Sequence, residues 1–238
     1  MNSPIMPIVN STQLLISVTS IEEAQIALAH GADIIDLKNP SAGALGALPV
    51  EQIKAIISFV RNNKGLSKKI TSATIGDLPM HPQLLRQHVV NMAATGVDII
   101  KIGFFECDNY QACLEALATL TQAGTKLMAV LFAETSYPEN LIASIKAAGF
   151  MGVMLDTAQK NGLTLLDYYS ETQRRALAQK VLNCHLRFGL AGSLKQEHVA
   201  MIKALNPSYI GFRGGVCNNH QRELHLDAEK IKAIRQLL

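Results

Sequence analysis

One recurring pattern constrains the fold of this chain more than any other feature. An alanine-rich helical stretch ends at a glycine, a short apolar run follows, and a polar residue closes the run, as in AHGADIIDLK, ATGVDIIKIG and AAGFMGVMLD. In NPSYIGFRGG the pair Asn206-Pro207 replaces the glycine. Gly31, Gly96 and Gly149 are placed where a helix ends in a left-handed turn, which glycine adopts without steric cost. The pattern therefore predicts helices and buried strands in alternation.

The same reasoning extends along the whole chain. We expect strands near residues 14–18, 33–37, 70–75, 98–102, 126–131, 151–155, 185–190 and 208–212. We expect helices near 20–30, 49–63, 81–94, 108–122, 137–148, 171–182, 194–204 and 227–237. Eight strands that are each followed by a helix predict a single-domain (β/α)₈ barrel, the TIM-barrel fold.

The main alternative is a doubly wound open sheet, which shows the same alternation of strand and helix. No GxGxxG sequence follows the first expected strand, and this absence favours the barrel. We assign the barrel to residues 14–238. Residues 1–13 contain no Lys or Arg and so lack the charged start of a signal peptide, and we interpret them as a short flexible lead-in.

Composition argues against several functional classes. The net charge is +3 without a basic block, so we expect neither nucleic-acid nor membrane-surface binding. The apolar runs are far shorter than the roughly 20 residues of a membrane-spanning helix. The four cysteines form no CxxC pair and the seven histidines no HExxH pair, His81 and His88 being the nearest in spacing. We expect a cytoplasmic protein without a metal or cofactor; whether it forms a homo-oligomer stays open.

Barrel enzymes place their active sites at the carboxyl ends of the strands. Charged residues make up only 17% of the chain, yet three of the expected strands end on them. These residues are Asp36 and Lys38, Lys101, and Asp156. Asp36 and Lys38 are two residues apart, so their side chains point the same way. A single lysine at a strand end is more often a solvated charge, but this group could converge at one rim.

Two lysines in a dry pocket would give one of them an unusual role. Each positive charge lowers the pKa of the other, and this leaves one amine neutral and nucleophilic. Neighbouring carboxylates would then transfer protons. Lysine, carboxylate and a phosphate site together are typical of enzymes that form a Schiff base with a sugar phosphate.

Three further charged residues near strand ends allow more than one interpretation. Asp77 could contact substrate, or it could be the turn residue before Leu78-Pro79. Lys160 could belong to the site or could be a solvated charge in a polar loop. Glu134 is interpreted as a charge at the start of a helix.

The loops after the last two strands predict a phosphate site, because barrels often bind phosphate there. Ser193 is expected to cap the next helix, with Gln196 three residues later. Free N–H groups of this region could cradle a phosphate. Arg213 could add a positive charge or could pair with a carboxylate at the rim. The candidate phosphate-binding residues are Gly192, Ser193, Arg213, Gly214 and Gly215.

Two features nearby have a less specific interpretation. The stretch 39–48, NPSAGALGAL, is rich in small residues. It could be a lid that closes over substrate, or an ordered turn. We interpret Cys217 as a small apolar filler.

Several segments resemble one enzyme family, the (5-formylfuran-3-yl)methyl phosphate synthases, which make the furan precursor of methanofuran. The resemblance covers residues 14–235, with the motifs in the same order and spacing. The segments that carry it are GADIIDLKNPSAGALGALP, TSATIGDLP, DIIKIG, MLDTAQKNGLTL, LAGSLKQEHV and GFRGG. The stretch AETSYPEN at 133–140 has no clear counterpart, so Glu134 receives no support from the family.

The resemblance implies a (β/α)₈ barrel that joins two molecules of glyceraldehyde 3-phosphate into a furan aldehyde phosphate, without a cofactor or metal. It implies that Lys38 forms the Schiff base and that Lys101 accepts a proton. Asp36, Asp156 and Lys160 would be further active-site residues. A class I aldolase or another triose-phosphate enzyme could use the same residues, and a non-catalytic barrel could bind a sugar phosphate with them.

Overall fold

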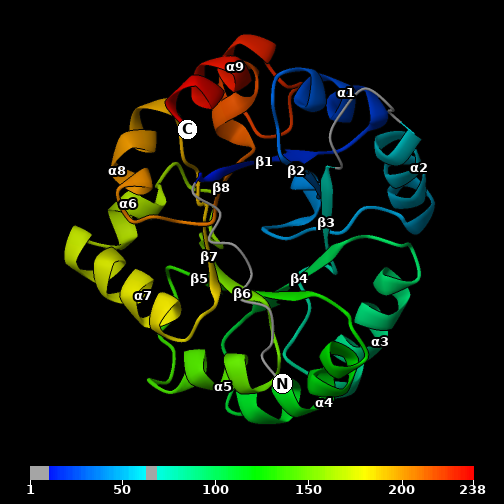
Figure 1. Ribbon diagram of the computed structural model, residues 1–238, viewed down its shortest axis with the longest axis vertical. Coiled ribbons are helices and arrows are strands. Elements are labelled where there is room, and N and C mark those ends of the chain that lie inside the picture. The colour runs from blue at the N-terminus through cyan, green and yellow to red at the C-terminus, as the bar shows by residue number, and fades with distance from the viewer. Residues whose placement is uncertain (1–10, 63–68) are drawn as a thin grey trace, which may run out of the picture.

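The computed structural model describes residues 11–62 and 69–238 and contains a closed barrel of parallel strands. The strands pair in chain order, and the last pairs back with the first (Figure 1). They are β1 (Gln13–Val18), β2 (Ile34–Leu37), β3 (Ile70–Thr74), β4 (Ile99–Phe104), β5 (Leu127–Phe132), β6 (Gly152–Asp156), β7 (Arg187–Leu190) and β8 (Tyr209–Phe212). This closure confirms the predicted (β/α)₈ barrel and excludes the open sheet.

Helices form a ring outside the barrel (Figure 1). They are α1 (Ile21–Ala29), α2 (Val50–Asn62), α3 (Pro82–Ala93), α4 (Tyr110–Gln122), α5 (Leu141–Ala147), α6 (Leu165–Tyr168), α7 (Glu171–Asn183), α8 (Val199–Lys203) and α9 (Ala228–Leu237). None of those helices has both the length and the apolarity that a membrane crossing needs.

The predicted glycine turns are confirmed by the backbone. Gly31, Gly96 and Gly149 have φ values of +95°, +82° and +80°. Asn206, which replaces the glycine in the fourth copy of the pattern, also has a positive φ of +51°. These residues end a helix and direct the chain into the next buried strand.

The expected helix at 194–204 is only partly formed. Ser193 has a φ of +52° and does not cap it, so that prediction was wrong. A short 3₁₀ turn at Gln196–His198 leads into α8, because the left-handed backbone at Gly192 and Ser193 reverses the chain first. The short helix α6 was not predicted.

The start of the chain also differs from the expectation. β1 begins at Gln13, and the Thr12 hydroxyl donates to the Pro207 carbonyl at 3.1 Å. These two residues therefore belong to the barrel. The rest of the expected lead-in, apart from Ser11, lies outside the described residues.

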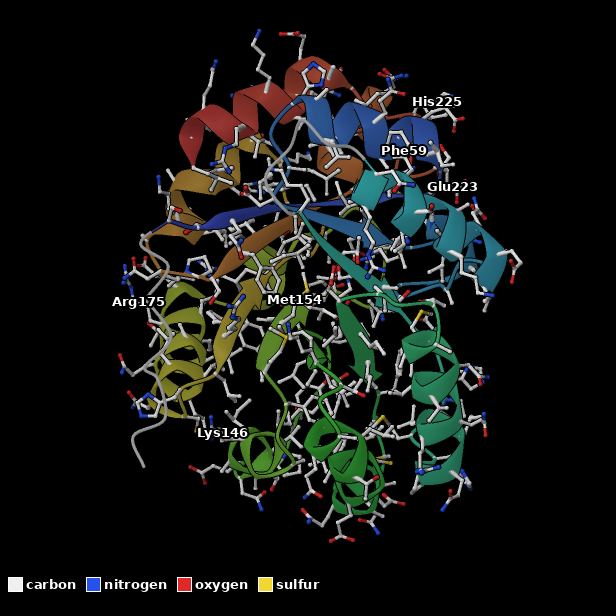
Figure 2. All side chains as sticks on the ribbon, turned by 45° about the vertical axis from the view of Figure 1, so that its right-hand side comes forward. Phe59, Lys146, Met154, Arg175, Glu223 and His225 are labelled. Carbon is white, nitrogen blue, oxygen red and sulfur yellow. The ribbon has the colours of Figure 1, made fainter. Side chains whose placement is uncertain are left out.

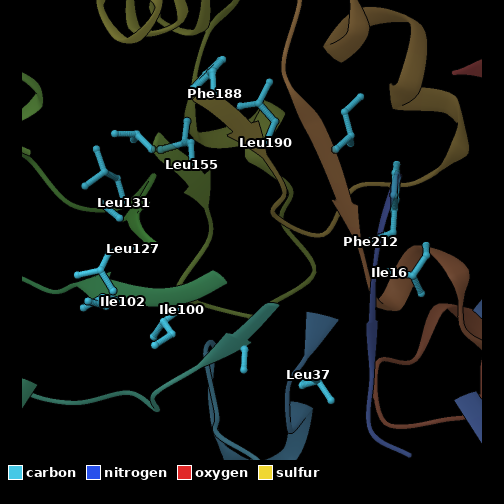
Figure 3. Packing of buried hydrophobic residues seen from close by; sticks show 14 of the residues in the cluster. Ile16, Leu37, Ile100, Ile102, Leu127, Leu131, Leu155, Phe188, Leu190 and Phe212 are labelled. Atoms are coloured by element: carbon cyan, nitrogen blue, oxygen red, sulfur yellow. The ribbon is translucent and has the colours of Figure 1, made fainter. Parts of the chain in front are cut away.

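Two apolar clusters hold the barrel together. The outer cluster lies between strands and helices, where Ile16, Leu131 and Phe188 point away from the barrel centre (Figure 3). The inner cluster fills the barrel and includes Tyr209. Met154 of the same cluster is labelled in Figure 2. Because the strands are buried on both faces, a charged side chain at their carboxyl ends has little access to water.

Candidate active site

A cavity of about 840 Å³ opens at the carboxyl ends of the strands. Its walls come from β1, β2, β4, β6 and β8 and from loops that follow the strands. The five residues that the family resemblance assigns to the active site all line it: Asp36, Lys38, Lys101, Asp156 and Lys160. The barrel therefore brings together side chains that are up to 124 positions apart in the sequence.

Asp36 is the most firmly held of these side chains. It is fully buried in β2 and accepts hydrogen bonds from Lys101 Nζ at 2.7 Å, Ser17 Oγ at 2.8 Å and Ser72 Oγ at 2.6 Å. Burial alone would raise the pKa of Asp36, but the charges of Lys101 and Lys38 outweigh it and lower that pKa below its ordinary value. Asp36 is therefore ionised and holds Lys101 in place.

Asp156 and Lys160 form a second ion pair across the loop after β6. Lys160 Nζ lies 3.2 Å from Asp156 Oδ1 and also donates to the Thr157 carbonyl at 2.6 Å. Burial would raise the pKa of Asp156, but Lys160 and Lys38 outweigh that effect and lower it to about 2. The two carboxylates of the site are thus both negatively charged at neutral pH.

Lys38 differs from the other two lysines in having no fixed partner. It follows β2, is only 6% exposed, and makes no side-chain hydrogen bond or ion pair with the residues that the structure describes. Its pKa is lowered to about 8: burial is the largest cause, Lys101 and Lys160 also lower it, and the charges of Asp156 and Asp36 oppose the shift. The predicted effect of a second lysine is present, but burial is the larger cause. Lys38 is the amine best suited to be neutral.

The loops after β7 and β8 supply backbone donors to the same cavity. Gly192, Ser193, Gly214 and Gly215 all line it, and their N–H groups have no acceptor among the described residues. A side chain at Gly215 would collide with the Leu194 carbonyl, so glycine is what lets the two loops touch. Free N–H groups at this rim suit an anion.

Arg213 pairs with a carboxylate, which is the second of the two roles that the sequence allowed for it. Its guanidinium pairs with Glu23 of α1 at 2.6 Å and also donates to the carbonyls of Ser17, Arg222 and Leu224. Glu23 and Arg213 are 4% and 8% exposed, so this is a buried pair. Arg213 lines the cavity with its donors already engaged.

Asp77 does not line the cavity but fixes a loop that does. Its carboxylate accepts the N–H groups of Ala44 at 2.8 Å and Leu45 at 2.7 Å. Gly43 has a φ of +112°, and a Cβ there would collide with the Asp77 carboxylate. Asp77 therefore braces the stretch 39–48, a role that neither sequence interpretation included.

The stretch 39–48 is an ordered turn rather than a free lid. The Asn39 N–H and the Thr74 hydroxyl both donate to the Gly46 carbonyl, at 2.8 and 3.0 Å. Leu45 is fully buried and belongs to the inner cluster of the barrel. The structure therefore favours the second alternative for this stretch.

Glu134 has a different role from the predicted one. Helix α5 begins at Leu141, so Glu134 does not start a helix. Its carboxylate instead accepts the N–H groups of Ala158 at 3.0 Å and Gln159 at 2.9 Å, in the loop that carries Lys160. Its position after β5 was the only sequence signal for this contact.

The sequence interpretation missed three other polar residues of the site. Ser17 of β1 and Ser72 of β3 donate hydrogen bonds to Asp36. Arg222 lines the cavity from the loop after β8. Cys217 is fully buried, as a small apolar filler would be. Within residues 11–62 and 69–238, the His, Cys, Asp and Glu side chains form no group of three that could hold a metal ion.

A closed (β/α)₈ barrel that gathers lysines and aspartates at the carboxyl ends of its strands has the architecture of a barrel enzyme. Solved structures of such barrels resemble it. Phosphoribosyl anthranilate isomerase from Thermus thermophilus superposes with a TM-score of 0.65 at 18% identity, covering 95% of this chain and 98% of that one. For a 3-hexulose-6-phosphate synthase the TM-score is 0.63 at 17% identity, covering 95% and 100%. At these identities the likeness shows the fold alone.

Sequence comparison is more specific. The model of the 4-HFC-P synthase family matches residues 14–235. A protein of Methylorubrum extorquens, provisionally named as a (5-formylfuran-3-yl)methyl phosphate synthase, is 40% identical, covering 92% of this chain and 88% of that protein. The (5-formylfuran-3-yl)methyl phosphate synthase of Methanocaldococcus jannaschii is 34% identical, covering 94% and 98%. The chain therefore belongs to the 4-HFC-P synthase family, as its motifs predicted.

Proposed function

We propose that the protein makes (5-formylfuran-3-yl)methyl phosphate, an early step of methanofuran biosynthesis, from two molecules of glyceraldehyde 3-phosphate through an imine at Lys38. The observation that carries the mechanism is the state of Lys38: a buried amine with a pKa of about 8, unpaired among the described residues, in a cavity with two ionised carboxylates. A neutral amine in such a place is a nucleophile toward an aldehyde. The proposal includes a cytoplasmic location, since triose phosphates are formed there.

The reaction begins with attack of Lys38 Nζ on the aldehyde carbon of one triose phosphate. The carbinolamine loses water to give an imine, and removal of a proton from the neighbouring carbon converts it to an enamine. Lys101 and Asp156 both lie near enough to influence the charge of Lys38, so they are suited to carry these protons. The enamine carbon then attacks the second aldehyde.

Ring closure and elimination complete the product. Two triose phosphates become one furan aldehyde phosphate with loss of one phosphate and two molecules of water, which balances the atoms. The N–H groups of the loops after β7 and β8 support binding of the phosphate that is retained. Clefts of roughly 300–1,000 Å³ hold drug-sized ligands, and two triose phosphates together are of that size.

The test is to incubate purified protein with glyceraldehyde 3-phosphate alone, and to measure the mass of the product and the phosphate released. We expect a furan aldehyde phosphate with one phosphate freed for each product molecule. A six-carbon bisphosphate with no phosphate released would instead identify an aldolase.

The matched variant is Lys38→Arg, which keeps the charge but cannot form the imine because a guanidinium does not lose its proton. We expect no product from it, and no adduct after borohydride treatment, whereas the wild type gives a reduced adduct on the peptide that contains Lys38. Full activity of Lys38→Arg would contradict the covalent mechanism.

A further inference from the structure

The proposed reaction brings two phosphate groups into one cavity, and the glycine loops account for one of them. Each phosphate monoester carries close to two negative charges at neutral pH. If one of those charges approached Lys38, it would favour the protonated amine and oppose imine formation. The second phosphate therefore needs a cation of its own.

Three of the six Lys and Arg residues that line the cavity already have a carboxylate partner among the described residues. Lys101 pairs with Asp36, Lys160 with Asp156, and Arg213 with Glu23. Lys38 forms the imine in the proposed mechanism, so it is not available to bind a phosphate. Lys195 follows the loop after β7, beside Gly192 and Ser193, and so belongs with the glycine loops.

Arg222 remains: it has no carboxylate partner in the described part of the chain, it does not form the imine, and its guanidinium lies at the loop after β2. It lines the cavity from the loop between β8 and α9, and no carboxylate of the described residues lies within 4 Å of its guanidinium. Its Nη2 donates to the Gly43 carbonyl at 2.7 Å, its one side-chain hydrogen bond to those residues. A guanidinium has five N–H donors, so most of the fork is free for a ligand.

The structure also fixes the position of this side chain at both ends. The Arg222 carbonyl accepts a hydrogen bond from Arg213 Nε at 2.6 Å, which anchors the backbone. The Gly43 carbonyl that holds the other end belongs to the loop braced by Asp77. Arg222 thus spans the rim from the loop after β8 to the loop after β2, in one orientation, before any ligand arrives.

We propose that Arg222 binds the phosphate of the second triose phosphate and thereby forms an anion subsite separate from the glycine loops. This inference rests on the proposed function for the identity of the ligand. The guanidinium would hold the phosphate through two parallel N–H···O bonds, the geometry in which arginine exceeds lysine. The backbone N–H groups of Gly192, Ser193, Gly214 and Gly215 hold the first triose phosphate. The guanidinium of Arg222, which reaches across to Gly43, holds the one that the enamine attacks.

The test uses Arg222→Gln in the full chain. Glutamine removes the charge and the fork, and because its side chain is two bonds shorter it also gives up the contact with the Gly43 carbonyl. Calorimetric titration with inorganic phosphate should give two sites per chain for the wild type and one for the variant. In assays with glyceraldehyde 3-phosphate, we expect KM to rise roughly ten- to hundredfold and kcat to change by less than about threefold.

Two further variants sharpen the result. Arg222→Lys keeps the charge but not the fork, and should recover only part of the loss in KM. Arg86→Gln removes an exposed arginine of α3 and should leave both readouts unchanged. Borohydride trapping at Lys38 should be as efficient in Arg222→Gln as in the wild type, because the first triose phosphate still binds.

The outcomes separate this subsite from the proposed function. Unchanged phosphate stoichiometry and KM in Arg222→Gln would overturn the subsite, as would a loss of Lys38 trapping together with a lowered melting temperature, which would assign Arg222 a structural role. A wild type that binds two phosphates, loses one of them in Arg222→Gln, and makes no furan would contradict the function and support the subsite.

Discussion

At the scale of single residues, Lys38 is the charged group of the site that burial destabilises without a compensating ion pair among the described residues. A buried amine that has no ion-pair partner within 4 Å among the described residues is destabilised as a cation, because the protein replaces water with a less polar environment. The two aspartates reduce this cost but are themselves held by Lys101 and Lys160. The same environment that destabilises the charge makes the neutral amine available.

This arrangement predicts the pH dependence of the reaction. Lys38 is protonated below its pKa of about 8 and neutral above it, and only the neutral amine attacks an aldehyde. We expect kcat/KM to rise about tenfold per pH unit up to roughly pH 8 and then to level off. Asp156, with a pKa of about 2, stays ionised throughout. Initial rates between pH 6 and 10 check this, and a flat profile would show that Lys38 is not the titrating group.

The buried charge also predicts a stability gain on its removal. The pKa of Lys38 is about 8 in the folded protein, below its ordinary value of 10.5, so folding is penalised while the amine is protonated. Lys38→Met should raise the free energy of unfolding at pH 7 by about 1–3 kcal/mol. The gain should shrink as pH rises from about 8 to 10.5, where the wild-type amine becomes neutral in both states.

Urea unfolding at pH 7 and pH 10 measures this gain. Lys180→Met, which removes an exposed lysine of α7, serves as the control and should change stability little. If Lys38→Met were less stable than the wild type at pH 7, the environment of Lys38 would have to be more polar than the structure indicates.

Single residues of the site were predictable from sequence where the strand pattern alone placed them. Asp36, Lys38 and Asp156 stand at strand ends, and strand periodicity aims them at one rim. Lys101 was expected to end its strand, but β4 continues to Phe104. Arg222 was missed and Glu134 was wrongly assigned to a helix start, because their contacts cross between loops whose paths depend on the closed barrel. No local pattern encodes such a crossing.

At the scale of elements, two loops of the site are held by the same device. Asp77, after β3, accepts two consecutive N–H groups of the loop after β2. Glu134, after β5, accepts two consecutive N–H groups of the loop after β6. In each case a carboxylate from one strand end fixes the loop that leaves a neighbouring strand and carries part of the cavity wall.

The second brace predicts an effect on catalysis at a distance. Glu134→Ala frees the N–H groups of Ala158 and Gln159, so the loop that carries Lys160 can move away from Asp156. A displacement of about 1 Å at a catalytic group can cost on the order of a hundredfold in rate, and we expect kcat to fall roughly ten- to hundredfold. Steady-state kinetics with glyceraldehyde 3-phosphate measures it.

The control for this variant is Glu139→Ala, which removes an exposed carboxylate shortly before α5. It should leave kcat unchanged. A Glu134→Ala protein with wild-type kcat would mean that the loop holds Lys160 without the brace.

The ends of helices were predictable from sequence where a glycine follows the helix, and less so elsewhere. Gly31, Gly96 and Gly149 end helices as expected, because few other residues adopt that backbone. The spacing of Ser193 and Gln196 is that of a capping box, yet the left-handed backbone at Ser193 prevents it. Sequence spacing does not report the backbone conformation of the capping residue.

At the scale of the whole molecule, the closing strand of the barrel has one weakly paired side. β7 and β8 share two register pairs, whereas β8 and β1 share four. Arg213, directly after β8, bonds to the Ser17 carbonyl of β1 and to Glu23 of α1. This buried ion pair links the last strand to the first strand and its helix.

Breaking that link should destabilise the fold strongly. Arg213→Met leaves the Glu23 carboxylate buried without its cation, and removal of one partner of a buried pair typically costs about 3–5 kcal/mol. Urea unfolding of the variant measures the loss. The double variant Glu23→Gln/Arg213→Met should recover part of it, because the uncompensated charge is gone. A loss below about 1 kcal/mol would mean that water reaches Glu23.

The alternation of helix and strand was enough to predict an α/β architecture. It does not by itself show that the sheet closes into a barrel. An open sheet and a barrel share their local pattern. The count of eight strand–helix units, the missing GxGxxG sequence and the family resemblance favoured the barrel. Closure depends on how eight strands stagger against one another, a property of the assembled sheet. The ion pair that secures the closing strand joins residues 190 positions apart and has no local signature.

The position of Leu45 links the reactivity of Lys38 to the order in which parts of the chain fold. The residue comes from the loop after β2, yet it packs inside the barrel close to Gly103 of β4. A side chain can occupy a barrel interior only after the surrounding strands have come together, so this wall of the cavity is completed late. Until then Lys38 is an ordinary hydrated, protonated lysine. A newly made or partly unfolded chain is thus protected from reacting with the free aldehydes of the cell, and reactivity appears only with the finished fold.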